Sequence, residues 1–183
     1  MCIRDRPCFQ HVIATQDWHP ADHSSFASQH ADNNIGDVIS LCGLDQVLWP
    51  NHCVQGTSGG DFAEQLNRPA DIRVFRKGTD SSIDSYSGFF DNGHRKSTGL
   101  EQYLDELDIK RVYVMGLATD YCVKFTVLDA LKLGLETYLV EDGCRGVNLQ
   151  PTDVVNAIEE MRQAGAQVVG SESILNERKE SKK

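Results

Sequence analysis

Short runs rich in β-branched residues alternate with helix-type patterns along this chain of 183 residues. The runs end in polar residues or glycine and lie at 11–15, 71–76, 111–115, 136–140 and 166–169. The clearest helical patterns lie between the later runs, at 99–107, 121–133 and 152–164, and Gly134 and Gly165 stand where helix C-caps belong. Strands that alternate with helices of this length form βαβ units. The pattern therefore predicts a three-layer α/β/α fold around a mostly parallel sheet.

No repeat, low-complexity tract or linker divides the chain. We expect one domain over 8–174, a non-native leader at 1–7 and a flexible charged tail at 175–183. The net charge of −9 argues against nucleic acid and anionic membranes as partners, because both repel an acidic protein. No apolar run is long enough to span a bilayer, and nothing at the start resembles a secretory signal. The cysteines form no Cys-x-x-Cys pair, which favours reduced thiols and a cytoplasmic location.

Polar residues that follow the expected strands are the candidates for chemistry, because ligands of parallel α/β sheets bind outside the carboxyl ends of the strands. The first run leads into Asp17 and His19, the second into Lys77, and the third into a turn that reaches Cys122. We therefore expect a metal-type pair, a lysine and a cysteine to converge on one face of the sheet.

Cys122 is expected in the first turn of the helix 121–133, with Thr119 or Asp120 as the cap. A thiolate there faces the positive end of the helix dipole, which lowers its pKa, and free N–H groups that can hold an oxyanion. A buried structural cysteine is the alternative, and position alone leaves the two readings about even. The remaining cysteines lack such a setting and are interpreted as inert: Cys2, Cys8, Cys42, Cys53 and Cys144.

Asp17 and His19 are two residues apart on an extended segment, so both side chains leave the same face. With His52 they make a carboxylate and two imidazoles, a set that suits zinc, iron or manganese. Hydrogen-bonded loop histidines are the commoner alternative, and His23 and His30 lie nearby in the sequence.

Lys77 and two aromatic residues also have two readings each. Near a nucleophilic thiol, Lys77 would stabilise the thiolate, whereas a lysine that reaches solvent from a loop is more frequent. Trp49 and Tyr86 lie in segments rich in turn residues, where they either pack in the core or form the walls of a site for a flat substrate.

Several segments, taken in order, resemble bacterial nicotinamidases of the isochorismatase-like hydrolase superfamily: 16–20, 49–55, 84–92, 114–123 and 142–147. The resemblance runs from about His11 to Ala166. It implies a cysteine amidohydrolase that converts nicotinamide to nicotinate and ammonia through a thioester, as part of NAD salvage. The implied partner is this small amide, and the oligomeric state stays open between a monomer and a homo-oligomer.

The resemblance also implies roles for individual residues. Lys77 and Cys122 match two members of an Asp-Lys-Cys triad. A cis peptide precedes the alanine that matches Ala118, and the N–H groups of Ala118 and Cys122 form the oxyanion hole.

The implied metal is zinc or iron, with manganese also suited to the donor set. Its implied ligands are Asp17, His19 and His52, and the implied walls of the nicotinamide pocket are Trp49 and Tyr86.

One departure concerns the start of the chain. The family begins with an apolar strand that ends in the triad aspartate, whereas this chain reaches the family's second strand at once. Asp5 has no apolar run before it, so it is not assigned as the base. We expect the first and central strand of the family order 3-2-1-4-5-6 to be missing, and this chain to lack significant activity. Another amidase of the superfamily and a non-catalytic metal-binding protein are the alternatives.

Overall fold

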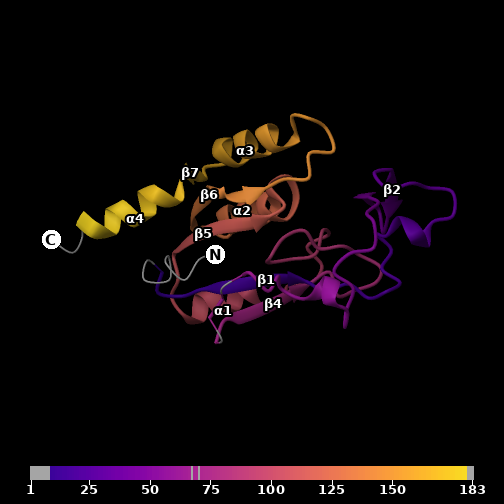
Figure 1. Ribbon diagram of the computed structural model, residues 1–183, viewed down its shortest axis with the longest axis horizontal. Coiled ribbons are helices and arrows are strands. Elements are labelled where there is room, and N and C mark those ends of the chain that lie inside the picture. Colours follow the sequence, from indigo (N-terminus) through magenta and orange to yellow (C-terminus); the bar gives the residue numbers. More distant parts are fainter. Residues whose placement is uncertain (1–8, 67, 70, 181–183) are drawn as a thin grey trace.

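The structure is a computed structural model that describes residues 9–66, 68, 69 and 71–180, so the leader expected at 1–7 lies outside the described residues. Figure 1 shows the arrangement of the strands and helices. The strands are β1 (Ile13–Asp17), β2 (Val38–Leu41), β3 (Leu44–Val47), β4 (Arg73–Lys77), β5 (Arg111–Leu117), β6 (Glu136–Arg145) and β7 (Gln167–Val169). The helices are α1 (Leu100–Glu106), α2 (Lys124–Lys132), α3 (Asp153–Gln163) and α4 (Ser171–Glu180).

The strands that alternate with helices pair in parallel. β1 pairs with β4, with Asp17 opposite Lys77, and β5, β6 and β7 form a second parallel sheet. The α/β class with parallel strands, expected from the alternation, is confirmed. The described residues contain no backbone pairing between β1 and β5, which is where the resemblance places a further strand.

Two clusters of buried apolar residues hold the helices on the strands. One joins α2 and α3 to β6, through Val127, Met161 and Leu139. The other joins α1 and α2 to β4, through Leu104, Ala130 and Phe75. Since α2 contributes to both clusters, it connects the packing of the two sheets.

The two glycines expected as helix caps have the backbone conformation that this role requires. Gly134 follows α2 with φ of 80°, and Gly165 follows α3 with φ of 110°. The N–H of Leu135 donates to the carbonyl of Ala130 at 3.0 Å, the long hydrogen bond of a Schellman motif. Left-handed backbone favours glycine because a Cβ is strained there, so the sequence predicted both helix ends correctly.

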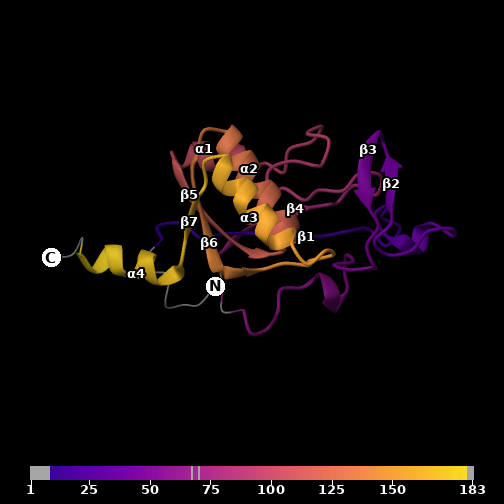
Figure 2. The ribbon, with the colours of Figure 1, turned by 90° about the horizontal axis from the view of Figure 1, so that it is seen from above.

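The hairpin of β2 and β3 was not expected from the sequence. Its two strands pair antiparallel and are joined by a two-residue turn, Cys42 and Gly43, both with positive φ. Such turns match the right-handed twist of the flanking strands. Figure 2 shows the hairpin set apart from the parallel strands, at the side to which β1 and β4 lead.

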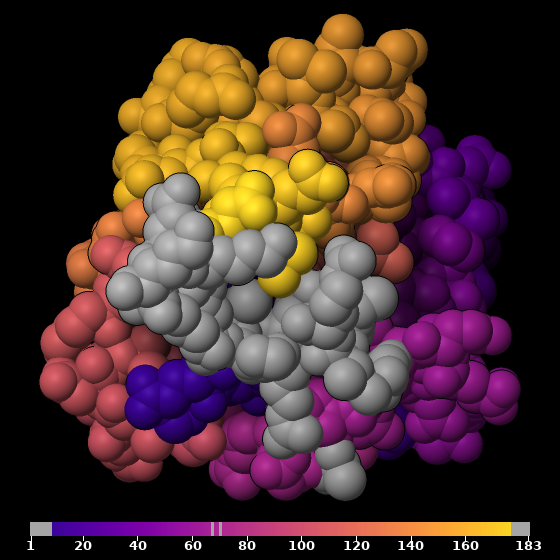
Figure 3. All heavy atoms as spheres, turned by 60° about the vertical axis from the view of Figure 1, so that its left-hand side comes forward, coloured from indigo at the N-terminus to yellow at the C-terminus, as the bar shows by residue number. Residues whose placement is uncertain are grey.

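Helix α4 begins beside the end of β6, where the backbone N–H and hydroxyl of Ser171 donate to the carboxylate of Asp142 at 2.8 and 2.6 Å. In Figure 3 it is the yellow segment against the orange part of the surface. The helix continues to Glu180 and so includes the described part of the tail expected at 175–183. No helix in the described part of the chain is long and apolar enough to cross a bilayer.

Candidate active site

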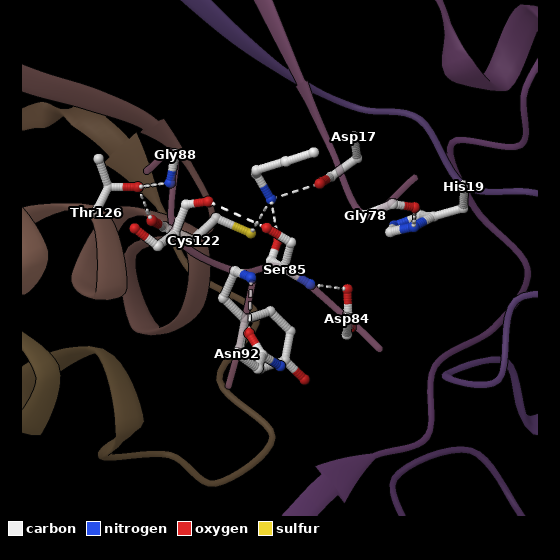
Figure 4. A network of polar contacts seen from close by, with 12 residues as sticks. Asp17, His19, Gly78, Asp84, Ser85, Gly88, Asn92, Cys122 and Thr126 are labelled. Carbon is white, nitrogen blue, oxygen red and sulfur yellow. Dashed lines mark hydrogen bonds and ion pairs between the residues drawn. The ribbon is translucent and has the colours of Figure 1, made fainter. Parts of the chain in front are cut away.

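The carboxyl ends of β1, β4 and β5 bring the expected site residues together. β1 ends at Asp17 and β4 at Lys77, its partner in the parallel register. β5 ends at Leu117 and leads into the turn that carries Cys122. Figure 4 shows Asp17 and Cys122 approaching the same point from the two sheets.

Lys77 is the side chain that connects the two sheets at this point, although only 4% of it is exposed. Its amine donates to the carboxylate of Asp17, to the carbonyl of Ser85 at 2.8 Å and to the sulfur of Cys122 at 3.2 Å. Burial lowers the pKa of Lys77, but its interactions with Cys122 and Asp17 outweigh burial and raise it. The amine is therefore a fixed cation with all three N–H groups engaged.

Cys122 lies in a π-helical turn, Thr119–Val123, that precedes α2, and not in the first turn of a regular helix. The expectation that Thr119 or Asp120 caps the helix is wrong. Neither side chain makes a capping hydrogen bond, and the carboxylate of Asp120 instead accepts from the N–H groups of Val147 and Asn148. Asp120 thus holds the loop after β6 against the turn that carries the thiol.

The pKa of Cys122 also differs from the expectation. Burial raises the pKa of this thiol to about 11, although Lys77 acts in the opposite direction. The sequence argument expected a lowered pKa from a helix dipole, but the loss of hydration exceeds that benefit. At neutral pH the thiol is therefore protonated, so its reaction with a carbonyl needs a base.

Leu117 and Ala118 are joined by a cis peptide bond, at the position where the resemblance implies one. The carbonyl of Ala118 accepts from the N–H groups of Tyr121 and Val123 at 3.1 and 3.0 Å. These bonds close the turn around Cys122.

The three residues expected to bind a metal lie together. One ligand atom each of Asp17, His19 and His52 lies within 4.8 Å of the others. His19 Nδ1 is 2.9 Å from the carbonyl of Gly78, and His52 Nδ1 is 2.9 Å from the carbonyl of Pro50. Since a carbonyl only accepts, each Nδ1 carries the proton and each Nε2 keeps its lone pair for a ligand. The donor set therefore fits a divalent cation.

The charges of this group suit a cation as well. Burial raises the pKa of Asp17, but the neighbouring cations, Lys77 above all, outweigh burial and hold it below its ordinary value. Burial lowers the pKa of His19, although nearby carboxylates oppose this. An ionised carboxylate and a neutral imidazole are the forms that bind metal.

Gly78 explains how His19 lies so close to β4. Its φ is +61°, and a Cβ placed there would lie 2.3 Å from His19 Cε1 and 2.5 Å from Nδ1. A side chain at this position would displace the imidazole, so the glycine directly after Lys77 allows the approach.

A second group of buried side chains adjoins the first. His19, His23 and Asp84 each have a ligand atom within 4.8 Å of the others. The sequence marked His23 only as a nearby histidine and did not mark Asp84. Among the described residues, His23 Nε2 has no hydrogen-bond partner. His30 lies outside both groups, and its Nε2 is hydrogen-bonded to the carbonyl of Ser24 at 2.8 Å.

Trp49 and Tyr86, which the resemblance implies as walls of the nicotinamide pocket, contact each other. The indole N–H of Trp49 donates to the hydroxyl of Tyr86 at 3.0 Å. Tyr121, next to Cys122, contacts both rings, with centroid distances of 4.7 and 5.4 Å. Phe125 on α2 also lies against Tyr86. The sequence analysis missed Tyr121 and Phe125, although their place beside the candidate nucleophile was a usable signal.

Four cysteines within the described residues are free: Cys42, Cys53, Cys122 and Cys144. Burial raises the pKa of Cys53 and of Cys144, and Cys144 donates to the carbonyl of Val140 at 3.3 Å. Cys2 and Cys8 lie outside the described residues. Among the four free cysteines, Cys122 is the one whose thiol accepts a hydrogen bond from a lysine.

Comparison with known proteins agrees with this geometry. The isochorismatase domain model matches residues 11–173. The nicotinamidase of Escherichia coli (strain K12) is 54% identical over 155 residues, which cover 85% of this chain and 72% of that protein.

Solved structures are similar too. A nicotinamidase/pyrazinamidase of Acinetobacter baumanii has a TM-score of 0.90 at 43% identity, covering 93% of this chain and 82% of that one. The pyrazinamidase of Pyrococcus horikoshii, solved in complex with zinc, has a TM-score of 0.72 at 35% identity. That match covers 91% of this chain and 79% of the other.

Proposed function

The chain belongs to the isochorismatase family, and we propose that it hydrolyses nicotinamide to nicotinate and ammonia. The observation that carries the proposal is the contact between the buried amine of Lys77 and the thiol of Cys122, beside a metal-type group, in a chain 54% identical to a nicotinamidase. This activity belongs to NAD salvage. A cytoplasmic location is part of the proposal and is supported by the free cysteines of the described residues.

Cys122 is the proposed nucleophile. Its thiolate attacks the carboxamide carbon, ammonia leaves with a returned proton, and water then hydrolyses the thioester to nicotinate. The raised pKa of Cys122 makes proton removal part of the reaction. We assign this proton to the triad aspartate that the resemblance implies. Asp17 is not assigned the role because Lys77 donates to its carboxylate, and Asp84 is not because the backbone N–H of Ser85 donates to its carboxylate at 2.7 Å.

Lys77 and the turn before α2 stabilise the charges that develop. The Lys77 amine lies 3.2 Å from the sulfur and supports the thiolate. The N–H groups of Ala118 and Cys122 are the proposed oxyanion hole, where fixed donors stabilise the oxyanion with little reorganisation. Trp49 and Tyr86 are the proposed walls for the flat ring.

Asp17, His19 and His52 would hold a divalent ion, zinc or iron, with manganese as a further candidate. Bound there, the ion supplies Lewis-acid attraction for the pyridine nitrogen and so selects nicotinamide over amides without one. The protein's own contribution is the orientation of both imidazoles by the carbonyls of Gly78 and Pro50.

The test is ammonia release from nicotinamide, with zinc or iron supplied, measured in two proteins. One is the 183-residue chain, and the other is the same chain preceded by an apolar strand that ends in the triad aspartate implied by the resemblance. We expect robust turnover in the second, because it carries the aspartate to which the proton is assigned. Benzamide, which lacks the ring nitrogen, should be a poor substrate. Failure of the extended protein to release ammonia from nicotinamide, or equal use of benzamide, would contradict the proposal.

A further inference from the structure

Gln46 is a buried polar residue in a strand of the hairpin. It lies on β3 opposite Ile39 of β2, and only 3% of it is exposed. A buried amide without partners is unfavourable, and an apolar side chain would suit such a position better. Its partners therefore indicate why a polar residue occupies it.

The amide nitrogen of Gln46 lies within hydrogen-bond distance of three acceptors. They are the carbonyl of Val47 at 2.8 Å, the hydroxyl of Tyr86 at 2.9 Å and the carboxylate of Asp84 at 3.2 Å. An amide nitrogen has two hydrogens and no acceptor site, so it only donates. The contact with Val47 stays within β3, whereas the contact with Tyr86 ties the hairpin to a wall of the proposed substrate site.

The Tyr86 hydroxyl accepts from two groups that can only donate, the Gln46 amide and the Trp49 indole, at 2.9 and 3.0 Å. Its own proton is therefore left to donate to a third group. Burial and the nearby carboxylate of Asp84 raise the pKa of Tyr86, so the phenol keeps this proton. The Gln46 and Trp49 donors thus fix the direction in which the Tyr86 hydroxyl can donate its own proton.

We propose that Gln46 is a positioning residue for the substrate. Its amide holds the hydroxyl of Tyr86 against the indole of Trp49, fixes the two aromatic walls relative to each other, and leaves the phenol proton to donate to the bound amide. The inference rests on the proposed function, because it needs Trp49 and Tyr86 to face nicotinamide.

The test is a double-mutant cycle on nicotinamide binding. The chain carries Cys122→Ala to prevent turnover, zinc is supplied, and the Kd is measured by calorimetry. Gln46→Met keeps the length of the side chain and removes the donor, and it should raise the Kd about threefold to tenfold. Tyr86→Phe removes the acceptor and should act similarly. The Kd of the double variant should be no more than about twofold above that of the single variant that binds nicotinamide less tightly. Both changes break the same hydrogen bond, so their effects should not multiply.

Gln163→Met on α3 is the matched control and should leave the Kd unchanged. Gln163 is exposed, and its side-chain amide donates to Glu159 of the same helix at 3.0 Å. A purely structural role for Gln46 would lower the thermal midpoint and leave the Kd of the folded protein unchanged, which overturns the inference. Independent, multiplying effects of the two substitutions also overturn it. If Gln46→Met does not fold, an unchanged Kd for nicotinamide in Tyr86→Phe would overturn the inference instead. Absence of nicotinamide binding in the parent chain contradicts the proposed function itself, and the inference falls with it.

Discussion

The two parallel sheets differ in what they bury. The part built around β5, β6 and β7 buries apolar side chains such as Val127, Leu139 and Met161, all essentially inaccessible to solvent. The carboxyl ends of β1 and β4, together with the loops next to them, bury ionisable groups instead, including His19 and Lys77. Apolar burial stabilises a fold, whereas burial of ionisable groups is unfavourable unless each is paired.

This difference separates a region whose apolar packing stabilises the fold from a region that contains most of the candidate site residues. Cys122 comes from the apolar side and meets the ionisable side through Lys77. The site therefore depends on the relative position of two sheets that the described residues do not join by backbone pairing. Substitutions on the two sides should separate activity from stability, and the following predictions test this.

The largest effect is expected at Cys122. Cys122→Ala should lower kcat for nicotinamide by more than about 10³-fold, because the nucleophile is lost, with little change in thermal stability. The assay is ammonia release in the N-terminally extended protein. Cys144→Ala is the matched control and should keep most activity. Comparable turnover in the wild type and Cys122→Ala would exclude covalent catalysis by this thiol.

Lys77→Met should lower kcat by about 10²–10³-fold, because a fixed charge beside the thiol is removed. The same change should slow alkylation of Cys122, because Lys77 lowers the pKa of the thiol and its loss raises that pKa further. In the unsubstituted chain, the thiolate fraction and the alkylation rate should rise about tenfold per pH unit up to about pH 11. Iodoacetamide labelling of the Cys122 peptide, followed by mass spectrometry, measures both. Faster labelling in Lys77→Met would contradict the assigned electrostatics.

A smaller effect is expected at Gly78. Gly78→Ala places a methyl group against His19 and should weaken zinc binding by about 10–100-fold, as measured by calorimetry, because the imidazole loses its orientation. Gly43→Ala is the control, since Gly43 also has positive φ but nothing lies within 4 Å of its added Cβ. Both variants share the backbone strain, so equal zinc affinity in the two would show that the contact with His19 has no role.

The smallest effect on the site is expected from a substitution in the apolar cluster that joins α3 to β6. Met161→Ala should lower the free energy of unfolding by about 2–5 kcal/mol, because it leaves a cavity between α3 and β6. The Kd for zinc and the kcat of the folded protein should stay within about twofold of the parent. Thermal denaturation and zinc titration at low temperature measure the two quantities. A large loss of zinc affinity would show that the two sides are not separable.

The sequence by itself determined the α/β class, the helix ends at Gly134 and Gly165, the strand ends at which Asp17 and Lys77 lie, and the strand that leads to Cys122. Periodicity and glycine positions are local signals, and parallel strands bring their carboxyl ends to one edge. The motifs that carry the family resemblance are also sequence properties, and they indicated the candidate residues for the metal site, the nucleophile and the aromatic walls.

Only the tertiary structure decided the environment of those residues. The raised pKa of Cys122 comes from burial by distant segments, which no local pattern reports. The hairpin was missed because its turn, Cys42 and Gly43, has no strong sequence signature, and Gln46 could not be connected with Tyr86 across 40 positions of sequence. Hydration, burial and hydrogen bonding between distant residues depend on the whole packed chain, so they lie beyond what a sequence pattern predicts.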